Sequence, residues 1–331
     1  MQFITHRRSE NGKNCIYVFG IKLFSFQTKT TSPTMQSVDK MKIYKKIRRY
    51  AGPDGFHRMK IDEFYAATGL LPNEELRTLN QKIKWDMIFN PTDLKRQCAD
   101  KILVRKYAAD KIDNQYFTKI LGQWDKASEI DFHTLPDAFV LKCNNGSDMN
   151  IAIKNKAKLD IQKTISICRD WLNTEYSLIY MEMQYYGMQK IVFAEEMLDL
   201  SEVEYKLYCF NGKVEFIEVI NNKMEKDPDC SKCYDRDWNE QDFYTEERKL
   251  TKHFPRPDNL NSLISLSEKL AEAFAFVRVD WFVLKNKDIK FAEMTFSSNA
   301  GEIEFTPKSM DETLGKLWNI PDRDTFGNII Q

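Results

Sequence analysis

The stretch FVRVDWFVLKNKDIKFAEMTF, residues 276 to 296, constrains the fold more than any other part of the chain. Two runs rich in β-branched and aromatic residues flank a polar centre, which is the pattern of an antiparallel hairpin. Alternation along the first run puts Arg278, Asp280 and Phe282 on one face, with the residues between them on the other. A two-residue turn at Asn286-Lys287 then fixes which residues of the two runs lie opposite each other.

This pairing brings two acidic side chains together. Asp280 faces Glu293, and Arg278 faces Thr295. Directly opposed side chains have Cβ atoms about 5 Å apart, and like charges at that separation destabilise a sheet. Either a cation lies between the two carboxylates, or the register differs by one residue, or both are solvated on an exposed face. For such a cation, hard oxygen ligands favour Mg²⁺ over zinc.

The rest of the chain is predicted to be α+β, with helices first and short strands after Asp131. The expected helices are Met41 to Tyr50, Pro72 to Phe89 (capped by Asn73), Asp93 to Ala109 (capped by Asp93), Asp160 to Leu172 and Asn259 to Phe274. The expected strands, besides the hairpin, are Ala138 to Cys143, Ile191 to Leu198, Glu204 to Phe210 and Lys213 to Ile220, the last two joined at Asn211-Gly212.

Positive charge is concentrated at the start of a chain whose formal charge is zero. The first fifty residues hold eleven Lys and Arg against two Asp and Glu, which leaves 38 against 47 in the remainder. Ile16 to Phe26 is expected to form two short strands, and a Thr/Ser-rich linker follows from Thr28 to Ser37. This basic leader is either a solvated extension or a tether to an anionic membrane face.

Composition excludes several classes of partner and location. Basic charge confined to the leader, with no known nucleic-acid-binding pattern, excludes nucleic acid. No run approaches the ~18 apolar residues of a membrane helix. Seven scattered cysteines without framework spacing favour a reducing compartment. We therefore expect a cytoplasmic protein, whose leader could bring it to the inner face of the membrane.

A second candidate site is FVLKCNNGS, residues 139 to 147. An apolar run ends at Lys142 and is followed by Asn144-Asn145-Gly146-Ser147, small residues that turn tightly and offer backbone N–H groups. A lysine beside such a loop is suited to holding phosphate oxygens while the loop covers them. The segment is not a Walker A sequence. An ordinary strand and turn is the more frequent explanation of this pattern.

A third candidate site is IVFAEEMLDLSEVEYKLYCFNGK, residues 191 to 213. A buried strand ends in Glu195-Glu196, and the next strand carries Glu204 and Lys206 on one face. Acidic side chains at a strand end can accept hydrogen bonds from an adenine amino group or ribose hydroxyls, and a lysine can meet a phosphate. Ordinary surface charges are the alternative.

These sites occur in an order that resembles ATP-grasp enzymes: a strand lysine before a small-residue loop, a strand ending in Glu, then RxD, then ExT. The sequences of these motifs are most similar to those of the teichuronopeptide-biosynthesis, or TupA-like, ATP-grasp family. The resemblance covers about residues 90 to 318. The stretches that carry it are DKILVRKYAADKI (100 to 112), LGQWDKASEIDFHTLPDAFVLKCNNGS (121 to 147), AEEML (194 to 198), EYKLYCFNGKVEFIEV (204 to 219), YDRDWN (234 to 239) and the hairpin.

The resemblance implies an ATP-grasp fold, in which two α+β lobes clamp ATP. We expect a basic leader over 1–40, a helical N-terminal region over 41–95, a first lobe over 96–198 and a second lobe with the metal hairpin over 199–320. The site roles that it implies fall on the following residues: Lys101, Lys142 and Ser147 at the phosphates, Glu195, Met197 and Leu198 at the adenine, Glu204 at the ribose, Lys206 at the phosphates or acceptor, Arg278 at the transferring phosphoryl group, and Asp280, Glu293 and Thr295 or Asn299 at magnesium.

Two departures from the family pattern bear on these roles. Thr295 replaces the Asn that many ATP-grasp enzymes use as third metal ligand. Ser298-Asn299-Ala300-Gly301 stands where a Pro-Gly-rich turn is usual.

The implied activity is that of an ATP-dependent carboxylate–amine ligase with ATP and Mg²⁺ as cofactors. By the resemblance, it joins an amino acid or amine to a uronic acid of a capsular or teichuronic-type surface polysaccharide or its precursor, through an acyl phosphate. One alternative is a glycosyltransferase that binds metal and a nucleotide sugar through Asp235 and Asp237, the DxD of Asp235-Arg236-Asp237. Another is a nucleotide-sensing protein without turnover. The sequence leaves the oligomeric state open.

Overall fold

The computed structural model describes residues 4–8, 14–18, 21–26, 49–50, 54–221, 230–245, 248–249 and 253–330. The expected linker at 28–37 and nearly all of the expected helix at 41–50 lie outside these residues. In the leader, three strands form an antiparallel sheet: β1 (Ile4–Arg8), β2 (Asn14–Val18) and β3 (Ile21–Phe26). The last two confirm the two strands expected there, and β1 was not predicted.

The smaller of the two main sheets is antiparallel. Its order is β4 (Ile120–Trp124), β7 (Val192–Glu196), β5 (Phe139–Cys143) and β6 (Asn150–Ile153). Helix α6 (Ile161–Leu172) packs against it, since Cys168 and Trp171 share a buried cluster with Phe139 and Leu141. Asp160 caps this helix by accepting from the backbone N–H of Lys163. The predicted helix and strands of this region are confirmed.

The larger sheet has six strands and carries one covering helix. Its order is β11 (Arg248–Lys249), β10 (Cys230–Tyr234), β9 (Lys213–Asn221), β8 (Leu200–Phe210), β12 (Phe276–Leu284) and β13 (Ile289–Thr295). Neighbours run antiparallel except β10 and β11. Helix α8 (Leu260–Ala271) covers the face that carries Val279 and Trp281, and the Trp281 indole donates to Ser267 Oγ at 2.9 Å. The opposite face of β12 is left for polar side chains.

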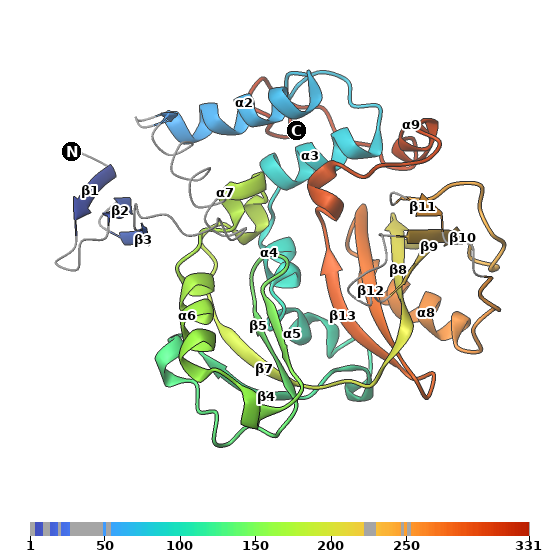
Figure 1. The fold of residues 1–331 in the computed structure, drawn as a ribbon. Coiled ribbons are helices and arrows are strands. Elements are labelled where there is room, and N and C mark those ends of the chain that lie inside the picture. Colours follow the sequence, from blue (N-terminus) through green and yellow to red (C-terminus); the bar gives the residue numbers. More distant parts are fainter. Residues whose placement is uncertain are drawn as a thin grey trace.

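In the described part of the chain, four α-helices precede β4. They are α2 (Gly55–Thr68), α3 (Leu79–Phe89), α4 (Asp93–Ala99) and α5 (Val104–Ala108). Two short α-helices come later, α7 (Ser177–Tyr180) and α9 (Ser309–Gly315). The 3-10 turns are η1 (Asn114–Tyr116), η2 (Ala127–Glu129), η3 (Lys156–Lys158), η4 (Met183–Tyr185) and η5 (Ser298–Gly301). Figure 1 shows the two main sheets on either side, with α4 and α5 between them. None of the helices in the described ranges is long and apolar enough to cross a membrane.

Two helix predictions were wrong at their boundaries. The helix expected from Pro72 begins at Leu79, because Thr78 and Gln81 form a reciprocal capping box that replaces the expected cap. The helix expected over 93–109 is broken into α4 and α5, and its cap is Thr92. The break arises because Asp100 Oδ1 accepts from the backbone N–H groups of Ile102 and Leu103. Helix α2 was not predicted.

The predicted register of the hairpin is confirmed around Asp280. Asp280 pairs with Glu293, and Arg278 pairs with Thr295. The two-residue turn was wrong, since the last pair is Val283 with Ile289 and the Leu284 N–H donates to the Asp288 carbonyl. A β-bulge between Asp280 and Trp281 compensates for the longer turn.

Candidate active site

The polar face of the larger sheet holds the predicted metal and phosphoryl residues. Arg278 and Asp280 lie on the same face of β12, and each is 6% exposed. The guanidinium donates to both carboxylate oxygens, through Nε at 2.7 Å and Nη2 at 2.6 Å. Burial acts to lower the pKa of Arg278, but Asp280 and Tyr208 raise it well above its ordinary value. The arginine therefore stays cationic at the centre of the site.

Cations already compensate the two opposed acids. Asp280 is paired with Arg278, and Glu293 Oε2 lies 3.5 Å from Lys101 Nζ. Burial would raise the pKa of Glu293, but the charges of Lys101 and Arg278 bring it below its ordinary value. Protein cations therefore offset the repulsion between these two acids, and a magnesium ion between them stays a prediction.

Lys101 links the two sheets at this point. It lies in the break between α4 and α5, and its backbone N–H donates to the Asn144 carbonyl at 3.1 Å. Its ammonium donates to the Gly146 carbonyl at 2.5 Å and pairs with Glu293. The lysine and the small-residue loop, which the sequence treats as separate features, thus meet beside the hairpin acids.

Lys142 and Glu195 form a second charged group on the smaller sheet. Glu195 Oε2 lies 2.7 Å from Lys142 Nζ, and Oε1 accepts from Arg105 Nη2 at 2.8 Å. Lys142 Nζ also lies 5.4 Å from the centre of the Phe282 ring, on the larger sheet. Sequence reasoning missed Arg105. Both oxygens of the predicted adenine acceptor are therefore held by cations, one on β5 and one on α5.

The predicted ribose and adenine residues lie where the two sheets connect. Met197 and Leu198 are half-buried in the link between β7 and β8. Glu204 lies on β8, with its Oε1 3.6 Å from Lys206 Nζ. Burial raises the pKa of Glu204, while Lys206 lowers it in part. Lys206 itself lies opposite Asp280.

The loop between β5 and β6 is held in one shape by buried contacts. Asn144 donates to Asp100 Oδ2 at 2.7 Å, and its own Oδ1 accepts from the Ile191 N–H. Gly146 has φ of 76°, and a Cβ there would come within 2.5 Å of the Tyr176 ring. Ser147 follows it and is exposed. Only glycine fits at 146, so the loop backbone is preorganised.

The two candidates for a third metal ligand differ in position. Thr295 Oγ1 accepts from Arg278 Nη2 at 3.3 Å and lies 3.4 Å from Glu293 Oε1, so it belongs to the polar cluster. Asn299 lies in η5 with φ of 45°, and its side chain is exposed. No hydrogen bond among the described residues joins the Asn299 side chain to the hairpin acids.

The donor set fits magnesium better than a protein-only metal cage. In the described ranges no three His, Cys, Asp or Glu side chains gather at metal-binding spacing. Mg²⁺ is commonly bound by one or two carboxylates, with waters and substrate phosphates completing the octahedron. Asp280 and Glu293, with Thr295 beside them, supply that number of protein ligands.

Sequence reasoning missed a buried carboxyl next to this cluster. Ser297, just beyond β13, donates its hydroxyl to Glu182 Oε1 at 2.5 Å and accepts from Gln184 Nε2 at 2.7 Å. Burial raises the pKa of Glu182 to about 7, and hydrogen bonds from Ser297 and Tyr176 limit that rise. The segment around Glu182 has no sequence pattern that would have revealed it.

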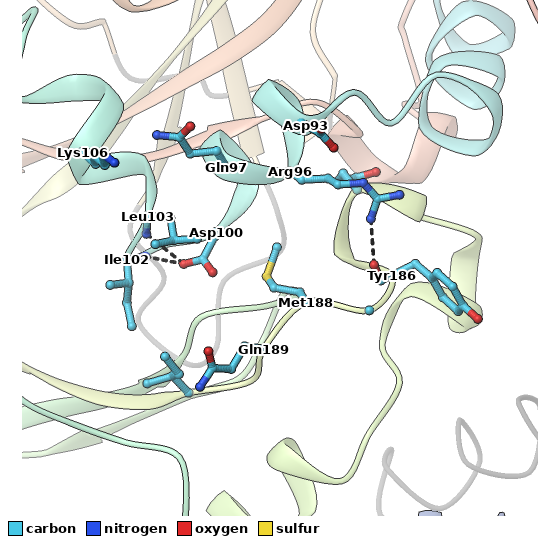
Figure 2. A pocket seen from close by; sticks show the side chains of 13 residues that line it. Asp93, Arg96, Gln97, Asp100, Ile102, Leu103, Lys106, Tyr186, Met188 and Gln189 are labelled. Carbon is cyan, nitrogen blue, oxygen red and sulfur yellow. Dashed lines mark hydrogen bonds between the residues drawn. The ribbon is translucent and has the colours of Figure 1, made fainter. Parts of the chain in front are cut away.

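A cavity of about 470 Å³ lies between the α4–α5 region and the chain leading into β7 (Figure 2). Arg96 closes one side by donating to the Tyr186 carbonyl at 2.7 Å. Asp100 and Ile102 line it, whereas Lys101 between them does not. None of the residues predicted for ATP or magnesium lines this cavity, so it adjoins the polar cluster without including it.

The carboxylate oxygens of Asp235, in the DxD motif, accept hydrogen bonds from residues of the same loop. Asp235 Oδ1 accepts from the backbone N–H groups of Asp237 and Asn239. Asp235 Oδ2 accepts from the Asn239 side-chain amide at 2.9 Å. Burial acts to raise the pKa of Asp235, but these hydrogen bonds together bring it below its ordinary value. The motif therefore acts as a turn here, and nothing in its geometry favours a nucleotide-sugar site.

Comparison with known proteins gives one matching family. A sequence model described as TupA-like ATPgrasp matches residues 81–319. No curated protein matches the chain. Similar solved structures include an ATP complex of D-alanine–D-alanine ligase from Bacillus anthracis, at 17% identity over 67% of this chain and 63% of that one, with a TM-score of 0.43.

Two further solved structures resemble the chain. L-amino acid ligase from Bacillus licheniformis has 15% identity over 62% of this chain and 44% of that one, with a TM-score of 0.40. The ADP complex of N5-carboxyaminoimidazole synthetase from Staphylococcus aureus has 14% identity over 61% and 45%, with a TM-score of 0.36. The chain spans less than two thirds of the length of each of these three structures.

Proposed function

The chain belongs to the TupA-like ATP-grasp family, and on that premise we propose that it is an ATP-dependent carboxylate–amine ligase. One observation carries the proposal. The opposed acids Asp280 and Glu293 share one polar face of the larger sheet with Arg278, and Lys101 reaches that face from the break between α4 and α5. Acids for a divalent ion and cations for phosphates are both needed to bind and activate ATP.

Lys101 and Lys142 would hold the phosphates, and the loop that ends in Ser147 would cover them. The fixed shape of this loop and the short bond from Lys101 to Gly146 support that role. We assign the adenine amino group to Glu195, the adenine ring to the backbone of Met197 or Leu198, and the ribose to Glu204. These residues line the connection between the two sheets.

Asp280 and Glu293 would hold the magnesium ion, with Thr295 or Asn299 as third protein ligand. Of these two, Thr295 has the better support, because it already contacts Glu293 and Arg278. When bound, Mg²⁺ neutralises charge on the terminal phosphates of ATP. The protein's own contribution is to align the two carboxylates through neighbouring cations, which also bring the pKa of Glu293 below its ordinary value.

The chemistry requires that a carboxylate be activated before an amine can attack it. ATP transfers its γ-phosphoryl group to the carboxylate, and the amine then displaces phosphate from the acyl phosphate. Arg278 would offset charge on the transferring group, and Lys206 would act at the phosphates or the acceptor. Losing one such contact typically costs ~3 kcal/mol of barrier, about a hundredfold in rate.

We further propose that the carboxylate is a uronic acid of a capsular or teichuronic-type surface polysaccharide or its precursor, and that the amine is an amino acid or a simple amine. The reaction would occur in the cytoplasm, and the basic leader would bring the enzyme to the inner membrane face. The family resemblance supports the substrate assignment, and the excess of Lys and Arg in the first fifty residues supports the membrane contact.

The test is a product assay with defined probes. Oligomers of glucuronic acid serve as carboxylate, and each of the common amino acids is supplied in turn with ATP and magnesium. ADP and phosphate should appear only when both the carboxylate and an amine are present. ATP hydrolysis that ignores both, or UDP-sugar binding without ATP binding, would argue against a ligase and in favour of a nucleotide-sensing protein or a glycosyltransferase respectively.

A further inference from the structure

An amine substrate must lose a proton before it can attack. Amino groups in water have pKa values of about 8 to 10.5, so at neutral pH they are mostly ammonium ions without a free lone pair. A side chain that takes this proton typically contributes 10²–10⁴-fold to the rate, and its pKa should lie near the working pH. None of the roles assigned above supplies such a group.

The hydroxyl of Ser297 and the carboxyl of Glu182 are arranged for proton transfer. Ser297 donates to Glu182 Oε1 at 2.5 Å and accepts from Gln184 Nε2 at 2.7 Å. Ser297 is 4% exposed and Glu182 is 6% exposed. Ser297 lies two residues beyond Thr295, at the end of the strand that carries Glu293. The pair is therefore close in the chain to the acids of the candidate magnesium site.

The same carboxyl is tied to the phosphate-covering loop. Tyr176 gives Glu182 a side-chain hydrogen bond and itself receives one from the Ser147 N–H. The Tyr176 ring lies against Gly146, and Lys101 donates to the Gly146 carbonyl. Glu182 thus connects to β13 on one side and to the loop over the phosphates on the other.

The other carboxylates of the site are held by cations. Asp280 takes two bonds from Arg278, Glu195 is bonded to Lys142 and Arg105, and Glu293 is paired with Lys101. A carboxylate held by a guanidinium or ammonium group is a poor proton acceptor, because the cation stabilises its ionised form. Glu182 instead receives its hydrogen bonds from neutral hydroxyls.

The charged and titratable groups that face Glu182 come from four neighbouring elements. Lys84 lies on α3, Lys101 between α4 and α5, Tyr176 before α7 and Tyr185 in η4. Burial raises the pKa of Glu182 to about 7, and the two lysine charges hold it from rising further. A carboxyl in this range can accept a proton at neutral pH and release it afterwards.

We propose that Ser297 and Glu182 form the relay that removes a proton from the amine substrate, an inference that rests on the proposed ligase function. A proton leaves the ammonium nitrogen for Ser297 Oγ as the Ser297 hydrogen passes to Glu182 Oε1. The freed nitrogen lone pair forms the N–C bond, the C–O bond to phosphate breaks, and phosphate leaves with that electron pair and the second N–H proton. Glu182 then returns its proton to solvent.

Hydroxylamine separates this relay from other roles of the same residues. It is a weakly basic nucleophile that is largely neutral at pH 7, so it traps an acyl phosphate as a hydroxamate without a base. The assay compares hydroxamate formation with amide formation for wild type, Glu182→Gln and Ser297→Ala, using glucuronic acid oligomers and the amino acid that wild type accepts. The matched control is Glu175→Gln, since Glu175 is also buried and accepts from a serine hydroxyl, Ser177, at 2.7 Å.

The expected result is that Glu182→Gln loses at least fiftyfold in amide formation while hydroxamate formation stays within threefold of wild type. The wild-type amide rate should fall below pH about 7 and level off above it. In Glu182→Gln the rate should instead follow the free-amine fraction and rise about tenfold per pH unit through this range. Glu175→Gln should leave both products unchanged. Equal loss of both products in Glu182→Gln, or loss of neither, would overturn the relay. Absence of hydroxamate in wild type would instead count against the ligase proposal itself.

Discussion

Asp280 and Glu293 lie directly opposite each other on β12 and β13, although both are acids. Their repulsion is offset by Arg278, bonded to both oxygens of Asp280, and by Lys101, 3.5 Å from Glu293. Two acids and two cations thus share one polar face.

Lys142→Ala should weaken ATP binding. The variant removes a cation assigned to the phosphates and leaves Glu195 paired with Arg105 alone. A hydrogen bond to a charged group is worth about 1.5–3 kcal/mol, so we expect KM for ATP to rise roughly ten- to hundredfold. Lys154→Ala is the control, since Lys154 is an exposed lysine just beyond the neighbouring strand. Equal KM values in the two variants would contradict the role of Lys142.

Gly146→Ala should damage the loop more than Gly187→Ala damages its own turn. Both glycines have positive φ, 76° and 71°, so alanine costs about 1–2 kcal/mol at either position. A Cβ at Gly146 would also lie 2.5 Å from the Tyr176 ring, whereas nothing lies within 4 Å at Gly187. Denaturant unfolding should therefore show the greater loss for Gly146→Ala, together with weaker ATP binding. Indistinguishable losses would mean that the ring moves aside at no cost.

Glu182 should make the protein less stable as pH rises. Its carboxyl has an ordinary pKa of 4.5 and a folded-state pKa raised to about 7, so between these values the folded state binds more protons than the unfolded state. Its contribution to stability is then present below pH 4.5, falls up to about pH 7, and is constant above that. The full change is on the order of 3 kcal/mol.

The measurement compares Tm for wild type and Glu182→Gln at pH 5 and pH 8. The variant should gain stability relative to wild type on going from pH 5 to pH 8, because glutamine does not ionise. The comparison cancels the titration of other groups. A Tm difference that does not change with pH would show that Glu182 titrates normally.

The register of the hairpin formed by β12 and β13 could be predicted because side-chain alternation and two complementary runs determine it locally. The turn at Asn211-Gly212 was also predictable, and both residues have the positive φ that a two-residue hairpin requires. The longer turn near Lys287 was not, because a bulge elsewhere in the hairpin restores the pairing of Asp280 with Glu293. A two-residue turn without a bulge and a longer turn with a bulge give the same pairing of Asp280 with Glu293, so the sequence fits either structure.

The missed residues share a different cause. Arg105 meets Glu195 across 90 positions, and Glu182 meets Ser297 across 115. Neither pair has a local spacing that marks it, since the contact exists only after the two sheets and their helices assemble. The predicted start of α3 was wrong for a local reason. Asn73 is a residue type that often caps helices, but Thr78 is the actual cap, because it forms the reciprocal capping box with Gln81.

Magnesium-dependent ATP binding tests the central claim most directly. Thermal unfolding is measured for wild type, Asp280→Asn and Glu293→Gln with ATP alone and with ATP and magnesium, and Asp288→Asn in the hairpin turn is the control. At 100 times its Kd, a ligand adds about 2.7 kcal/mol of stability. We predict that magnesium with ATP raises Tm for wild type and the control, and that both site variants lose this shift. An undiminished magnesium-dependent shift in both Asp280→Asn and Glu293→Gln would contradict the account.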